Sequence, residues 1–147
     1  MIRIVFGLLA VLLSGSIALA AAPEPAGACG SQAKVPADQR LSNTARWTTA
    51  SEANTFGYDV YRGDSENGKF TRITKTPVLG NGTTSETNKY QFVDDTIDPC
   101  REYWYYVEEI TTSGSREKFT TVFKAKAKRH PDGTMAETGA PAEKKAH

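Results

Sequence analysis

Four consecutive aromatic residues, Tyr103 to Tyr106, constrain the fold of this 147-residue chain more than any other feature. They begin the segment 102–111, the longest β-like segment in the sequence. Alternate side chains of a strand point to opposite faces of a sheet, so two of these rings can enter a core and two must face away from it. We therefore expect a sheet with one face packed inward and an aromatic outer face.

Short segments of β-like composition, separated by turn residues, continue along most of the chain. In residues 58–62, Tyr58 and Val60 lie on one face of the expected strand, while Asp59 and Tyr61 lie on the other. Several short strands at this spacing predict an all-β antiparallel sandwich of about seven strands, and no helix is expected after the first 20 residues. The expected strands are 43–49, 58–62, 69–74, 89–94, 102–111 and 116–127, and the segments 51–57, 63–68 and 77–88 are expected to be turns or loops.

The first 20 residues have the pattern of a secretory signal peptide. Arg3 precedes an apolar run at 4–13, and the small residues around Ala18–Ala20 suit cleavage, so the mature chain is expected to begin near Ala21. A membrane anchor is the alternative, but a span needs about 20 apolar residues. Lipid attachment at Cys29 is a further, weaker alternative. We expect a secreted or periplasmic protein with no membrane span in its mature chain.

Charge and cysteine content restrict the classes of function and the compartment. The chain has 18 basic and 17 acidic residues, and loss of Arg3 with the signal peptide would leave equal numbers. A nucleic-acid-binding domain would show a basic stripe, so we expect no nucleic-acid partner. The two cysteines, Cys29 and Cys100, predict one disulfide bond within the chain, because an even number in an exported protein favours pairing. Two free thiols or an intermolecular bond are the alternatives.

The two ends of the mature chain differ in composition from its middle. Residues 21–38 are rich in Ala, Pro and Gly and predict a leader with one short strand at most. Residues 128–147 cannot bury enough apolar surface to offset their ordering entropy, so they predict a disordered tail. The domain itself is expected at 39–127.

Three local patterns in residues 39–127, some three-fifths of the chain, resemble a fibronectin type III domain of the type found in secreted bacterial proteins. The first is Trp47 followed by "TASEANTFGYDVYR", and the second is the return strand "GKFTRI". The third, Ile97-x-Pro99-x-Arg101-x-Tyr103, is similar to the Leu-x-Pro-x-Thr-x-Tyr corner of that family, although Arg101 departs from Thr. Together the three patterns are fairly specific, whereas none of them is so alone.

The resemblance implies an immunoglobulin-like sandwich and several residue roles. Tyr103 would be the tyrosine corner, with its hydroxyl bonded to the backbone of the turn at 95–100. Glu109 would point inward near the open end of the sandwich, hydrated or hydrogen-bonded. The first strand of this family begins at the pole opposite Cys100, so the leader would have to leave the usual path for Cys29 to reach its partner. The implied core is Trp47, Tyr58, Val60, Phe70, Ile73, Tyr90, Phe92, Tyr105 and Val107.

The residue types that support catalysis or metal binding are sparse. Both histidines, His130 and His147, lie in the predicted tail, which removes histidine-assisted nucleophiles and the usual zinc sites from the domain. Asp94, Asp95 and Asp98 could form a weak calcium site, but a polar crossover loop is the favoured interpretation. We expect no enzyme, no cofactor and no metal.

The outward rings are the only functional signal in the sequence. If Tyr103 and Tyr105 point inward, Trp104 and Tyr106 point outward, and Tyr61 on the neighbouring strand can lie across from one of them. Cross-strand aromatic pairing alone can explain these rings. The other interpretation is a docking surface for an envelope or extracellular protein, or for a glycan. The expected function is a non-catalytic binding or spacer module, and the alternative is a structural accessory protein of the cell envelope.

Overall fold

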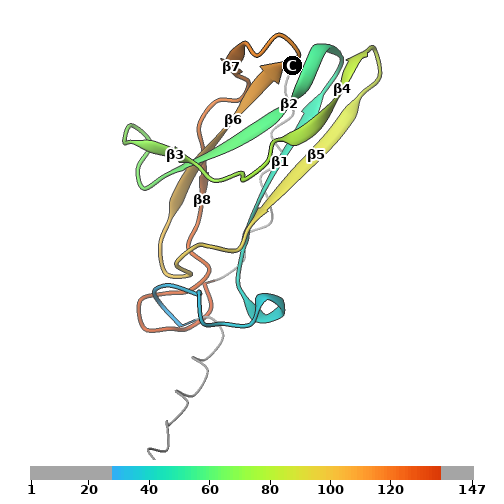
Figure 1. Ribbon diagram of the computed structural model, residues 1–147. Coiled ribbons are helices and arrows are strands. Elements are labelled where there is room, and N and C mark those ends of the chain that lie inside the picture. Colours follow the sequence, from blue (N-terminus) through green and yellow to red (C-terminus); the bar gives the residue numbers. More distant parts are fainter. Residues whose placement is uncertain (1–27, 137–147) are drawn as a thin grey trace, which may run out of the picture.

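The computed structural model describes residues 28–136 and shows an all-β sandwich of antiparallel sheets, as the sequence predicts (Figure 1). The predicted signal peptide lies outside the described residues. Within those residues, no helix has the length and apolar character needed to cross a membrane. The elements are the 3₁₀ turn η1 (Ala37–Gln39) and the strands β1 (Asn43–Thr49), β2 (Glu52–Gly63), β3 (Phe70–Arg72), β4 (Val78–Thr84), β5 (Asn88–Asp94), β6 (Tyr103–Thr111), β7 (Arg116–Lys118) and β8 (Phe123–Ala125).

The eight strands divide unequally between two sheets. The smaller sheet consists of β1 and β5, which pair along their full length without a register shift. The larger sheet is built on β2 and β6, which pair from Thr55–Thr111 to Gly63–Trp104. Strands β3 and β4 share the other edge of β2, and β7 and β8 share the other edge of β6.

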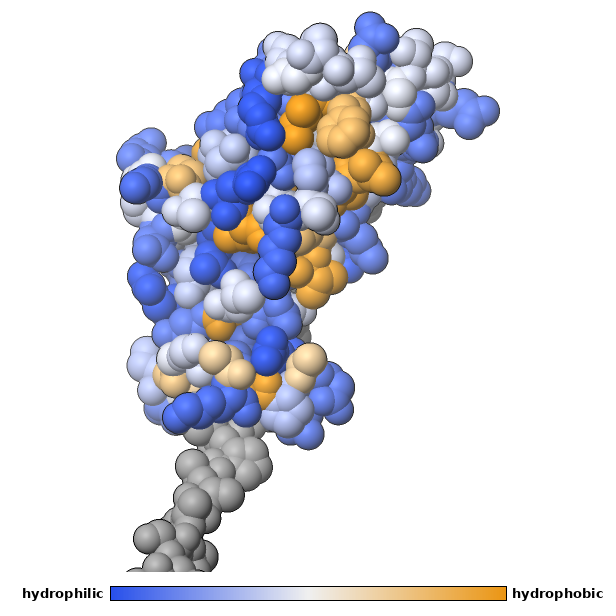
Figure 2. All heavy atoms as spheres, viewed as in Figure 1, coloured by the Kyte–Doolittle hydropathy of each residue, from blue (hydrophilic) through white to orange (hydrophobic). Residues whose placement is uncertain are grey.

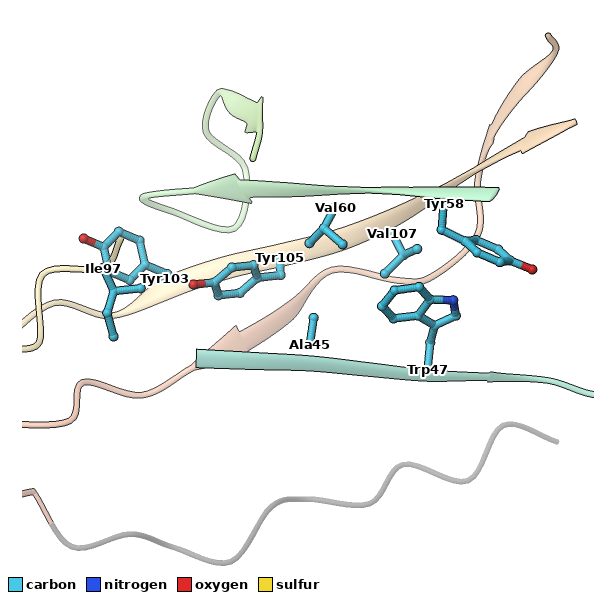
Figure 3. Close-up of a cluster of buried hydrophobic side chains, with 8 residues drawn as sticks. All are labelled: Ala45, Trp47, Tyr58, Val60, Ile97, Tyr103, Tyr105 and Val107. Atoms are coloured by element: carbon cyan, nitrogen blue, oxygen red, sulfur yellow. The ribbon is translucent and has the colours of Figure 1, made fainter. Parts of the chain in front are cut away.

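The hydrophobic core fills the space between the two sheets (Figure 3). Val60 and Val107 are cross-strand partners in the larger sheet and point toward Ala45 and Trp47 of β1. Inward residues alternate with outward residues along β6, as the aromatic run predicts. The buried cluster is Ala45, Trp47, Tyr58, Val60, Ile97, Tyr103, Tyr105 and Val107.

Most of the predicted core residues belong to this cluster or lie at its margin, but Phe70 does not. Ile73, Tyr90 and Phe92 are half-buried against the cluster. Phe70 instead contacts Tyr106, with 5.1 Å between the ring centroids, on the outer side of the larger sheet. Strand β3 is only three residues long, and its pairing of Phe70 with Gly63 places the ring beside the outward aromatic residues.

Two expected turns are strand residues in the structure. The segment 51–57 belongs largely to β2, and 77–88 contains β4. Their turn-forming residues produce bulges: Asn54 and Gly82 have positive φ, and the β2–β4 register shifts on both sides of Thr55. At Gly57 a Cβ atom would lie 2.5 Å from the carbonyl oxygen of Val78, so the close approach of β4 requires glycine there.

The expected strand 116–127 is divided into β7 and β8. Between them, the N–H groups of Phe119 and Thr120 donate to the carbonyl oxygen of Val107 at 2.8 and 3.2 Å, and the Thr120 hydroxyl accepts from the Val107 N–H at 2.9 Å. The chain therefore turns inward, and Phe119 packs edge-on against Tyr58, with 5.5 Å between the centroids.

The leader crosses the lower pole of the sandwich, which is the end that contains Cys100. The predicted disulfide bond between Cys29 and Cys100 is present. The buried side chain of Gln32 donates to the carbonyl oxygens of Leu41 and Ile97 at 2.8 and 2.9 Å. Residues 28–42 form no strand, so the leader departs from the path of a first strand, as the bond requires.

Contacts at the lower pole differ from one predicted boundary, that of the C-terminal tail, and include the backbone hydrogen bond predicted for Tyr103. The expectation of a disordered tail from residue 128 is wrong for residues 128–136. Their backbone N–H groups at Lys128 and Arg129 donate to the Pro99 carbonyl, and they form an Arg129–Met135 bridge. The Tyr103 hydroxyl accepts from the Asp98 N–H at 3.0 Å, so it bonds the backbone of the turn at 95–100.

Candidate functional site

The outer face of the larger sheet, the side turned away from β1 and β5, carries the predicted aromatic residues. Tyr61 and Tyr106 are direct cross-strand partners, and their rings stack with 4.7 Å between centroids and an interplanar angle of 7°. Phe70 continues this row by its contact with Tyr106. We call Tyr61, Phe70 and Tyr106 the aromatic row.

Basic side chains cover part of these rings. The Nζ of Lys118 lies 4.3 Å from the centroid of Tyr106, and the Nζ of Lys124 lies 4.9 Å from that of Trp104. Trp104 pairs with Lys124 and Gly63, so it lies beside the aromatic row rather than in it. Tyr61, Trp104 and Tyr106 are half-buried rather than exposed, because the lysine stems and the stacked rings shield one another.

A buried carboxylate stands next to the aromatic row. Asp59 is fully buried although its side chain lies on the outer face. The Thr74 hydroxyl donates to it at 2.6 Å, and the guanidinium groups of Arg116 and Arg72 donate at 2.9 and 3.2 Å. Burial alone raises the pKa of Asp59, but these hydrogen bonds outweigh burial and hold the pKa below its ordinary value. We call Asp59, Arg72, Thr74 and Arg116 the Asp59 cluster.

The Asp59 cluster connects to the aromatic row through Glu108. Arg116 donates to Glu108 at 2.7 Å, and Glu108 also accepts from the Tyr61 hydroxyl at 3.1 Å. Burial and the hydrogen bond to Glu108 raise the pKa of Tyr61, so its hydroxyl remains a donor at neutral pH. Ion pairs and hydrogen bonds therefore fix the stacked rings in position from one side.

Apolar side chains gather at the opposite end of the same face. Leu79 and Ile110 are cross-strand partners of Gly57 on its two sides, and Phe56 is the bulged residue beside it. Leu79 is 67% exposed and Phe56 is 47% exposed, whereas Ile110 is buried. Figure 2 shows apolar surface where β2, β4 and β6 meet. We call Phe56, Leu79 and Ile110 the apolar end of the outer face.

Glu52 is a second buried carboxylate, at the end of the sandwich opposite Cys100. It accepts from the hydroxyls of Tyr90, Tyr58 and Thr49 and, at 2.7 Å, from the N–H of Asn81. Burial raises its pKa, but the four hydrogen bonds together outweigh burial, and the pKa lies below its ordinary value. Burial and the hydrogen bond to Glu52 raise the pKa of Tyr90 to about 12.

Asp94 at the end of β5 and the two aspartates of the crossover loop, Asp95 and Asp98, each bind protein groups. Asp94 accepts from Arg62 at 2.8 Å and from Tyr105 at 2.9 Å, and Asp95 pairs with Arg40 at 3.1 Å. Asp98 accepts from the Cys100 N–H at 2.9 Å. The part of the chain that the structure describes contains no group of three His, Cys, Asp or Glu residues able to hold a metal ion.

Two hollows lie at the lower pole, away from the outer face. The smaller, of about 260 Å³, is bordered by Gln32, Arg40 and Asp95, and the larger, of about 660 Å³, by Cys100, Lys126 and His130. Their linings are the leader, the crossover loop and the residues after β8. Neither hollow includes the aromatic row or Trp104.

The sequence indicates only part of this site. Strand alternation finds Tyr61, Trp104 and Tyr106 and places Asp59 outward, but it does not show that Asp59 is buried. Arg72, Thr74 and Arg116 lie on other segments, so only the folding of those segments against β2 and β6 brings them to Asp59. The chain matches no protein-family model, no curated protein and no solved structure.

Proposed function

We propose that this chain is a non-catalytic, exported module with a sandwich of the fibronectin type III kind, and that it binds a protein through the outer face of the larger sheet. The observation that carries the proposal is the combination on one face of the aromatic row, Trp104 and the exposed apolar end. Aromatic residues anchor protein interfaces, and contiguous apolar surface marks docking sites. The disulfide bond is compatible with export to a periplasmic or extracellular location.

A protein partner suits this face better than a glycan does. Sugars stack on a free ring face, but the faces of Tyr61 and Tyr106 cover each other and Lys118 lies over Tyr106. Because the two rings stack face to face, their edges and the lysine stems remain for contact with a partner. Aromatic residues are enriched in the core of protein interfaces, and polar groups such as these lysines lie at the rim.

The environments of the buried acids support a non-catalytic role. A general acid at neutral pH needs a raised pKa. Glu52 and Asp59 instead have lowered pKa values, because hydrogen bonds satisfy their carboxylates. These acids act as structural acceptors that hold strands together.

The proposal is tested by capture from an envelope or secreted extract with the chain beginning at Ala21. We expect Trp104→Ala to retain the wild-type circular dichroism spectrum and to lose more than about fivefold in partner affinity, the loss expected of an interface anchor. The matched control is Val93→Ala, which truncates an exposed apolar residue on the smaller sheet. Equal capture by wild type and Trp104→Ala would favour the alternative, in which the rings only stabilise the sheet of an envelope accessory protein.

A further inference from the structure

Among residues 28–136, the smaller sheet has an open edge that the proposed function does not use. Strand β1 pairs with β5 through seven consecutive residues, and no strand among residues 28–136 pairs with its other edge. About half of the N–H and C=O groups of an edge strand point away from its one partner. The free edge of β1 therefore offers a row of backbone donors and acceptors about 23 Å long, at roughly 3.3 Å per residue.

This edge borders a thinly covered part of the core. Strand β5 lies on the β4 side of the sandwich, as a hydrogen bond between the two strands shows: the Asn81 amide of β4 donates to the Tyr90 hydroxyl of β5 at 3.1 Å. The free edge of β1 therefore faces the side of β7 and β8. On that side Phe119 is 38% exposed and Phe123 is half-buried, although both contact core tyrosines. A strand added to β1 would place its inward side chains over these rings.

Strand β1 has few of the features that keep an edge strand from pairing. It contains no proline, no lysine and no bulge, and its register with β5 is regular. Its outward residues are Thr44, Arg46 and Thr48, and Arg46 carries the only charge in the strand. The side chain of Arg46 is exposed, and its guanidinium has no ion-pair or hydrogen-bond partner within residues 28–136.

We propose that the free edge of β1 binds an extended strand of another protein, with small or apolar residues facing inward and an acidic residue opposite Arg46. The charge of Arg46 also argues against a second copy of this chain. A twofold pairing that used the full length of β1 would be centred on Arg46, and it would set two guanidinium groups directly opposite each other. An acidic residue at that position turns the same contact into an attractive cross-strand pair.

Two synthetic peptides and amide hydrogen exchange test the proposal on the full chain. The peptides are TVTVEVTVT and its twin TVTVKVTVT, which differ only in the charge that lies opposite Arg46. The glutamate peptide is expected to slow exchange at alternate β1 amides and to bind roughly three- to tenfold more tightly than the lysine peptide. In Arg46→Glu this order is expected to reverse, while the control Lys69→Glu, far from β1 in the β2–β3 loop, keeps it.

Any of the following outcomes would contradict the proposal. Outward β1 amides that exchange slowly in the free chain at every concentration would show that the chain covers its own edge. Protection that increases with protein concentration would identify a second copy as the occupant. Peptide-induced changes confined to the outer face of the larger sheet, or equal binding of both peptides to wild type and Arg46→Glu, would remove the acidic strand as the ligand.

Discussion

Replacing Asp59 with alanine is expected to lower the free energy of unfolding by about 1–3 kcal/mol. The main loss is at Thr74, whose hydroxyl is nearly inaccessible and donates to Asp59 at 2.6 Å. A buried donor left without its acceptor costs about 1–3 kcal/mol. Arg72 and Arg116 are 46% and 41% exposed, so water can replace Asp59 as their hydrogen-bond acceptor. Their contribution to the loss of unfolding free energy is therefore small. Urea unfolding, followed by circular dichroism, measures this change as a shift of the unfolding midpoint while the dependence of the free energy on urea concentration stays the same.

Two further variants show whether the Thr74 hydroxyl carries the effect. Asp59→Ala combined with Thr74→Val removes both partners, so the double variant is expected to lose less stability than the two single variants together. Asp64→Ala is the matched control, because Asp64 is 68% exposed and its ion-pair partner, Arg101, is exposed as well. A loss below about 0.5 kcal/mol for Asp59→Ala, or strict additivity in the double variant, would refute a satisfied buried carboxylate at this position.

Three more variants or conditions test other parts of the structure. Tyr103→Phe is expected to cost about 1 kcal/mol in urea unfolding, because the Asp98 N–H loses its acceptor; an unchanged midpoint would show that the hydrogen bond contributes nothing. The pKa of Glu52 is lower in the folded than in the unfolded chain, so its contribution is full above the ordinary value of 4.5 and is lost as the pH falls below it. Unfolding free energies between pH 3 and 7 should therefore fall less steeply toward acid in Glu52→Gln than in wild type, and equal slopes would contradict the assignment. Reducing the Cys29–Cys100 bond, which spans 71 residues, is expected to cost about 4 kcal/mol on the chain-entropy model, and urea midpoints with and without dithiothreitol would show whether the loss is that large.

Most of the assignment of residues to the core or to the outer face could be predicted from the alternation of side chains along the strands. Along β6 it separates Tyr103, Tyr105 and Val107 from Trp104 and Tyr106, and this separation defines both the core and the outer face. The disulfide bond was predicted from the number of cysteines, because two cysteines in a chain that is expected to be exported favour pairing. These predictions succeed because each rests on one strand or one chemical rule.

Features that depend on two segments at once were missed. Asn54, Gly80 and Gly82 are typical turn residues, yet in β2 and β4 they allow bulges and close strand approach. Only the pairing partner distinguishes a bulge from a turn. The same holds for Phe70, whose place beside Tyr106 follows from the short β2–β3 register.

Composition alone gave one wrong boundary at the C-terminal end of the domain. Residues 128–136 have few apolar side chains, but the carbonyl of Pro99 accepts two of their N–H groups. Backbone hydrogen bonds of this kind order a segment without a hydrophobic core of its own. No pattern of residue types within the segment signals them.

Site-specific photo-crosslinking tests the central proposal, a protein-binding outer face, most directly. A benzoylphenylalanine is placed at Leu79, which is 67% exposed on the outer face, or at Val93, which is 51% exposed on the smaller sheet. Both chains are irradiated in envelope or secreted extract. The proposal predicts a protein adduct from position 79 that excess unlabelled wild-type chain suppresses, with no such adduct from position 93. The absence of an adduct at 79, or the same adduct from both positions, would contradict it.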